Sequence, residues 1–115
     1  MATERRLQAS ASATLNASGA GQAELGPGVG GRGSANWRVT GVIVQTTRPG
    51  AAPVPKCQVY VDRVAPGASQ GLTYDGSFDQ GGVDLVIPRG SRLIAAWSGG
   101  QSGDVATITV TGVQW

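Results

Sequence analysis

The chain has 115 residues, enough for one hydrophobic core, and its composition is 40% hydrophobic and only 14% charged. The nine Lys and Arg residues are scattered and the formal net charge is +2, so the chain lacks the basic, aromatic-rich stripe by which proteins bind nucleic acids. Histidine is absent and Cys57 is the single cysteine, which excludes His-based catalytic sets, a zinc site from one chain's thiolates or histidines, and an intrachain disulfide framework.

The N-terminal residues predict neither a signal peptide nor a membrane-spanning segment, because no continuous apolar stretch follows the charged residues at positions 4–6. We therefore expect a protein that is made in the cytoplasm and has no membrane partner. Residues 1–115 are expected to form one domain, with residues 1–6 as a flexible N-terminal arm.

Residues 7–16 alternate between apolar and polar side chains, which is typical of a strand with one apolar face. The apolar positions are Leu7, Ala9, Ala11, Ala13 and Leu15. A turn at residues 18–21 then leads into a short second strand over residues 22–25.

A glycine-rich segment, residues 26–34, follows the second strand. Gly26, Gly28 and Gly31 match the G-x-G-x-x-G pattern of dinucleotide-binding loops, but that motif requires a helix after its last glycine, and here a strand pattern follows. We therefore expect a surface loop and no cofactor.

The β-branched residues of segment 37–46 predict a central strand with Trp37, Val39 and Ile43 on one face and Val42 and Val44 on the other. Apolar residues on both faces indicate that this strand is covered twice. Prolines then make residues 49–55 a connection between strands.

Residues 56–62 alternate again and predict a strand with Cys57, Val59 and Val61 facing inward and Tyr60 facing outward. In that position Cys57 is expected to be an inert buried side chain. Further strands are predicted at residues 72–74, 83–87, 92–97 and 105–115.

Asp75, Ser77 and Asp79 occupy alternate positions around Gly76, which resembles the beginning of a calcium-binding loop. The glutamate that ends such a loop is missing, so Asp75 and Asp79 are weak metal candidates. An Asp-Gly hairpin turn is the favoured interpretation.

About eight short strands, separated by Gly and Pro turns and without helical periodicity, predict an all-β fold: an antiparallel, jelly-roll-like β-sandwich. Trp37 and Trp97 are expected to pack in its core, whereas an exposed Trp115 would be covered by a neighbouring subunit. The predicted subunit interface consists of Leu7, Ala9, Ala11, Ala13, Leu15 and Trp115.

The order of several short motifs resembles small virion-associated proteins of tailed phages that infect actinobacteria. The motifs are Gly26-Pro27, Trp37-Arg38-Val39, Cys57 to Tyr60, Tyr74-Asp75-Gly76 with Asp79, and Trp97 to Gly100 with Gly103. The resemblance implies a jelly-roll-like subunit, commonly trimeric, that decorates the capsid or belongs to the tail.

We therefore expect a non-catalytic structural protein of the virion that forms a homo-oligomer, a trimer if the resemblance holds, and binds phage capsid or tail proteins. The alternative is a tail-associated module that recognises a host-surface carbohydrate. Its candidate ligand contacts are Tyr60, Tyr74 and Trp97.

Overall fold

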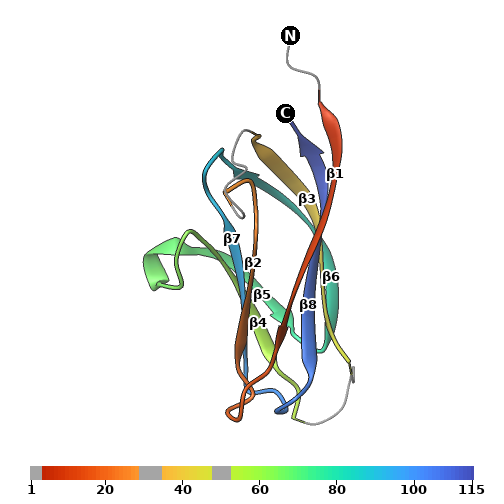
Figure 1. Cartoon of the computed structure of the whole chain (residues 1–115), viewed down its shortest axis with the longest axis vertical. Coiled ribbons are helices and arrows are strands. Elements are labelled where there is room, and N and C mark those ends of the chain that lie inside the picture. The colour runs from red at the N-terminus through yellow and green to blue at the C-terminus, as the bar shows by residue number, and fades with distance from the viewer. Residues whose placement is uncertain (1–3, 29–34, 48–52) are drawn as a thin grey trace.

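The structure is a computed structural model that describes residues 4–28, 35–47 and 53–115 (Figure 1). Its described part contains eight strands, one short 3-10 turn and no α-helix. The strands are β1 (Arg5–Thr14), β2 (Gly21–Leu25), β3 (Trp37–Thr46), β4 (Lys56–Val61), β5 (Ser69–Asp75), β6 (Phe78–Ile87), β7 (Leu93–Ser98) and β8 (Val105–Gln114), with the turn η2 (Pro66–Ala68) before β5.

The strands form two antiparallel four-stranded sheets, with the orders β1-β8-β3-β6 and β2-β7-β4-β5. The chain crosses between the two layers after every strand except β4, which is followed by β5 in the same sheet. This order is the eight-stranded jelly roll, so the predicted β-sandwich is confirmed. We call the two layers the first sheet, which contains β1, and the second sheet, which contains β2.

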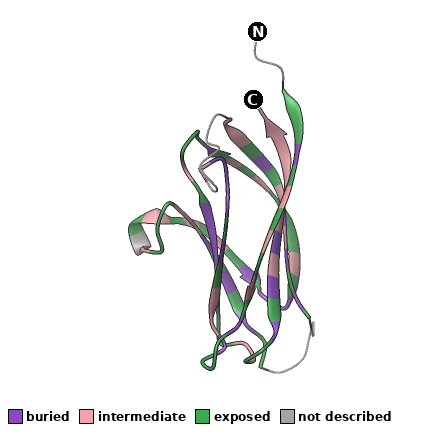
Figure 2. Cartoon of the chain, in the orientation of Figure 1, coloured by how far each residue is buried: buried purple, intermediate pink, exposed green. Residues whose placement is uncertain are grey.

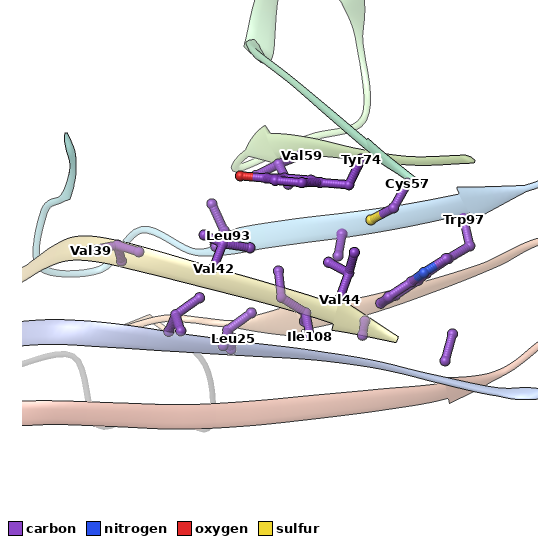
Figure 3. Close-up of a cluster of buried hydrophobic side chains, with 14 of the residues drawn as sticks. Leu25, Val39, Val42, Val44, Cys57, Val59, Tyr74, Leu93, Trp97 and Ile108 are labelled. Carbon is purple, nitrogen blue, oxygen red and sulfur yellow. The ribbon is translucent and has the colours of Figure 1, made fainter. Parts of the chain in front are cut away.

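The core lies between the sheets, where each strand contributes the alternate side chains that point inward (Figure 2). Its largest fully buried side chain is Trp97, which belongs to the same core cluster as Val44 of β3 and Ile108 of β8 (Figure 3). Cys57 and Val59 are also fully buried, as the alternation in segment 56–62 predicts, and Val61 is partly buried against the same core.

The predicted division of the β3 side chains between the two faces of the strand is wrong. A register shift between Val39 and Gly41 interrupts the two-residue period, so that Val39, Val42 and Val44 all point into the core. Ile43 consequently points outward and is only half-buried. The predicted central position of β3 is confirmed, because β8 and β6 flank it.

The N-terminal arm is shorter than predicted. Arg5 and Arg6 belong to β1, where they pair with Gln114 and Val113 of β8. The first and last strands are thus neighbours in the first sheet, and their outer ends lie together at one end of the sandwich (Figure 1).

The predicted glycine-rich surface loop begins with a packed segment. Gly26 and Pro27 are buried, and the amide of Gly28 donates a hydrogen bond to the carbonyl of Ser91 at 2.8 Å. The rest of that loop, residues 29–34 with Gly31, lies outside the described residues.

Candidate functional site

The structure places the apolar side chains of the predicted interface in the protomer's own core. Leu7 and Leu15 are 2% exposed, and Ala9, Ala11 and Ala13 pack against the core cluster. The alternation was assigned correctly, but its apolar face covers the second sheet, because a sandwich of this size needs β1 to close its core. These five residues are therefore not a contact surface for another subunit.

Trp115 differs from the other predicted interface residues because it remains 37% exposed at the end of the sandwich. Its backbone is fixed by two hydrogen bonds with Asn36, N–H to carbonyl, at 2.8 and 3.1 Å. The side chain is thus presented to solvent from an ordered position.

The exposed side of β1 carries hydroxyl groups that face those of β8. Ser10 Oγ lies 3.0 Å from Thr109 Oγ1, and Ser12 Oγ lies 2.8 Å from Thr107 Oγ1. Such cross-strand pairs stabilise a sheet and hold the paired side chains in fixed positions on its surface. We call these four residues the hydroxyl ladder.

The same outer face also carries exposed apolar side chains. Phe78 and Val86 of β6 are 50% and 53% exposed, and Val105 of β8 is 38% exposed. Arg38 and Asp84 form an exposed ion pair at 2.9 Å, which raises the pKa of the Arg38 guanidinium through its hydrogen bond and charge. The outer face of the first sheet is thus mainly uncharged and partly apolar.

The edge strand β1 is the longest regular edge of the sandwich. Its ten residues pair with β8 without a register shift, and none of residues 7–14 is charged or a proline. By contrast, β2 has five residues, β5 has a register shift near Gly71 with a φ of 68°, and β6 has a register shift and two acidic residues. Among the described residues, no strand pairs with the free edge of β1.

Two of the three predicted ligand contacts are buried. Trp97 is 1% exposed and its indole Nε1–H donates a hydrogen bond to the Gly76 carbonyl at 3.1 Å. Tyr74 is 9% exposed, and burial, with smaller effects of Cys57 and Asp79, raises the pKa of its hydroxyl. Both point into the core, where a glycan has no access.

Tyr60, the third predicted contact, points to the outer side of the second sheet and lines a surface hollow of about 460 Å³. The lining residues are Gln58, Tyr60, Val64, Ala65 and Ser69, and we call the site the Tyr60 hollow. Sequence reasoning identified only Tyr60, because the other residues reach the site through a loop whose course the alternation does not predict.

Asp75 and Asp79 stabilise a tight turn, but the predicted hairpin is wrong, because this turn carries the chain from β5 in the second sheet to β6 in the first. Asp75 Oδ1 accepts hydrogen bonds from Ser77 Oγ at 2.8 Å and Ser77 N at 3.0 Å, which hold the pKa of the Asp75 carboxyl below its usual value. Asp79 Oδ2 accepts one from the Asp75 amide at 3.1 Å. No cluster of three metal-ligating side chains occurs among the described residues, and the turn interpretation accounts for both carboxylates.

Comparison with known protein families, curated proteins and solved structures gives no match. The part of the chain that the structure describes contains no helix of the length and apolar character needed to cross a membrane.

Proposed function

We propose that this protein is a non-catalytic, homo-oligomeric structural subunit of a phage particle, which assembles through the outer face of the first sheet and its β1 edge. The sequence resemblance supports the phage assignment, with capsid decoration first and a tail position second. The observation that carries the assembly surface is β1 itself, an unpaired edge with regular pairing to β8 whose residues 7–14 include no charge and no proline.

Natural β-proteins protect long strand edges with charges, prolines, bulges or short length, because an open edge pairs with other chains. The edges β2, β5 and β6 are short or carry a register shift, whereas β1 is long and regular and has its charged residues, Arg5 and Arg6, only at its start. In a protein that works as an oligomer, the unprotected edge is the one that a second copy covers.

The side chains on the outer face of the first sheet, next to β1, have the composition of a protein interface. The hydroxyl ladder is uncharged, and Phe78, Val86 and Val105 extend apolar area across the same outer face. Interface centres are depleted in charge, whereas solvated surfaces are not. A neighbouring subunit or the particle surface would cover this face.

Sedimentation velocity on matched Gln→Lys variants tests the assembly surface. Gln8 and Gln22 are both exposed residues of edge strands, the first on β1 and the second on β2. We expect Gln8→Lys to weaken self-association at least about tenfold, because a lysine on an edge strand would have to lose its hydration when a second copy covers that edge. Gln22→Lys should behave as the unchanged protein does.

A monomeric unchanged protein, or equal effects of the two variants, would refute the assembly surface. Placement in the virion is tested separately, by immunogold electron microscopy of intact particles with an antibody against the purified chain. Label at regular capsid or tail positions is the expected result, and unlabelled particles that also lack the chain by mass spectrometry would refute the virion role.

A further inference from the structure

The Tyr60 hollow lies on the side of the sandwich opposite the proposed assembly surface. Gln58 and Tyr60 are outward residues of β4, and Ser69 of β5 is the register partner of Tyr60. The loop between these strands supplies Val64 and Ala65 and projects away from the sandwich (Figure 1). A subunit that assembles through the first sheet therefore leaves this hollow open.

The loop that forms the hollow is held by an unusual backbone conformation. Asp62 has a φ of 68°, the only positive φ of a non-glycine residue in the described chain. Its carboxylate accepts hydrogen bonds from the Arg92 amide at 3.1 Å and from Ser91 Oγ at 3.2 Å, and its own amide donates to the Arg92 carbonyl at 2.9 Å. Because several hydrogen bonds hold Asp62 in a strained conformation, the loop begins from a fixed backbone position.

The polar groups of the hollow leave hydrogen-bonding capacity for a ligand. The Tyr60 hydroxyl donates to Gln58 Oε1 at 3.0 Å, so the Gln58 amide can donate and the Tyr60 oxygen can accept. Ser69 Oγ accepts from the Gly71 amide at 3.3 Å, which leaves its own hydrogen to be donated. The site thus presents neutral donors and acceptors side by side.

Apolar groups complete the lining. Val64 is 42% exposed in a loop that contributes nothing to the core cluster, and Ala65 lies beside it. With the Tyr60 ring they offer an apolar surface next to the polar groups. A volume of about 460 Å³ falls within the range of small-ligand sites.

We propose that the Tyr60 hollow binds a neutral sugar unit of a glycan. A sugar ring combines hydroxyl groups with an apolar C–H face, which matches donors and acceptors beside an aromatic ring. None of the five lining residues is charged, so the site offers no cation for a phosphate or sulfate and no carboxylate for a metal ion.

The test is a titration of the full, isotope-labelled chain with neutral oligosaccharides of glucose, galactose and mannose, followed by the backbone amide resonances. We expect at least one of them to shift the amides of Gln58, Tyr60 and Ser69. Tyr60→Ala should weaken this binding at least about tenfold, as removal of a central aromatic contact does in other binding sites. Tyr60→Phe, which keeps the ring, should weaken it less.

Val54→Ala is the control, because Val54 is an exposed apolar residue that belongs neither to the Tyr60 hollow nor to the proposed assembly surface. It should leave sugar binding unchanged. The proposal fails if no neutral oligosaccharide shifts the hollow's amides, if sulfated or phosphorylated sugars alone shift them, or if Val54→Ala and a folded Tyr60→Ala have equal effects. These outcomes are independent of self-association, which Gln8→Lys measures.

Discussion

Trp97 connects the turn between β5 and β6 to the centre of the core. Its indole donates to the Gly76 carbonyl, and a Cβ on Gly76 would lie 2.8 Å from Trp97 Cδ1. The turn therefore needs glycine at position 76 because the indole occupies the space of a side chain. This contact couples the conformation of the Asp75-Gly76 turn to the packing of Trp97 in the core.

Replacement of Trp97 by Phe should lower the free energy of unfolding by about 2–4 kcal/mol, because it leaves the Gly76 carbonyl without its donor and creates a cavity. Urea denaturation followed by circular dichroism measures the loss. Trp37→Phe, at a half-buried residue on the margin of the core, should cost less than about 1.5 kcal/mol. Equal losses would contradict the role given to the indole hydrogen bond.

Cys57 predicts a specific pH dependence. Burial raises the pKa of its thiol from 9.0 to about 12, so above pH 9 the unfolded chain loses this proton while the folded chain keeps it. The thiol therefore does not lower the free energy of unfolding below pH 9. As the pH rises from 9 towards 12, it lowers the free energy of unfolding by at most about 1.4 kcal/mol per pH unit. Tyr74, with a hydroxyl pKa that burial also raises, acts in the same direction.

Urea denaturation at several pH values above 8 measures this decline for the unchanged chain and for Cys57→Ala. The variant loses stability at every pH through its cavity, but its alkaline decline should be shallower. If the free energies of unfolding of the two proteins decline in parallel with pH, the thiol has the same pKa in the folded and unfolded chains.

At the residue scale, the inward positions of Cys57, Val59 and Trp97 could be predicted from alternation. Ile43 could not, because the register shift near Gly41 depends on how β3 pairs with both neighbours. Asp62 could not either, since its positive φ is stabilised by residues 91 and 92, thirty positions away along the chain.

The structure of the first sheet depends on the irregular pairing of β3 with β8. Gly112 lies opposite Val39 at the register shift, and a Cβ there would be 1.9 Å from the Arg38 carbonyl oxygen. The close approach of the two backbones therefore requires a residue without a side chain.

Gly112→Ala should lower the free energy of unfolding by about 1–3 kcal/mol through this clash. Gly82→Ala is the control, because Gly82 lies in β6 across β3 from the same irregularity and its nearest atom to an added Cβ is 3.8 Å away. Thermal unfolding of both variants gives the comparison. A loss from Gly82→Ala as large as that from Gly112→Ala would contradict a steric cause.

At the element scale, all eight strands were predicted, but β5 and β6 extend beyond the predicted segments 72–74 and 83–87. The additional residues include Gly81 and Gly82, which have low strand propensity and are kept in β6 by pairing with β3. The apolar residues of β1, which were predicted as an interface, pack against the core for another reason. Alternation identifies two faces but does not say which one the second sheet covers.

As a whole molecule, the sandwich has two different outer faces. The first sheet presents the hydroxyl ladder and exposed apolar side chains, whereas the second sheet presents the Tyr60 hollow and the exposed Glu24–Arg92 ion pair. If both proposals hold, assembly uses one face and ligand binding the other, so that an oligomer displays several hollows. Several weak sites on one particle give a combined affinity far above that of each.

Self-association also predicts concentration-dependent stability. If unfolding separates the subunits, the thermal midpoint should rise by about 3–4 °C for each tenfold increase in protein concentration, from the usual unfolding entropy of a domain of this length. Differential scanning fluorimetry over about a hundredfold concentration range measures the slope. Gln8→Lys should flatten it, and a flat slope for the unchanged chain would contradict an oligomer held together by folded subunits.

The position of β8 between β1 and β3 has a consequence for biosynthesis. The ribosome produces β1 first and β8 last among the eight strands, yet β1 meets the rest of its sheet only through β8. A nascent chain therefore keeps β1 without a sheet partner until the final strand has emerged, and the jelly roll closes only after translation of that strand. Chains released early, before β8, would leave two strand edges open and should be cleared or aggregate rather than accumulate as folded fragments.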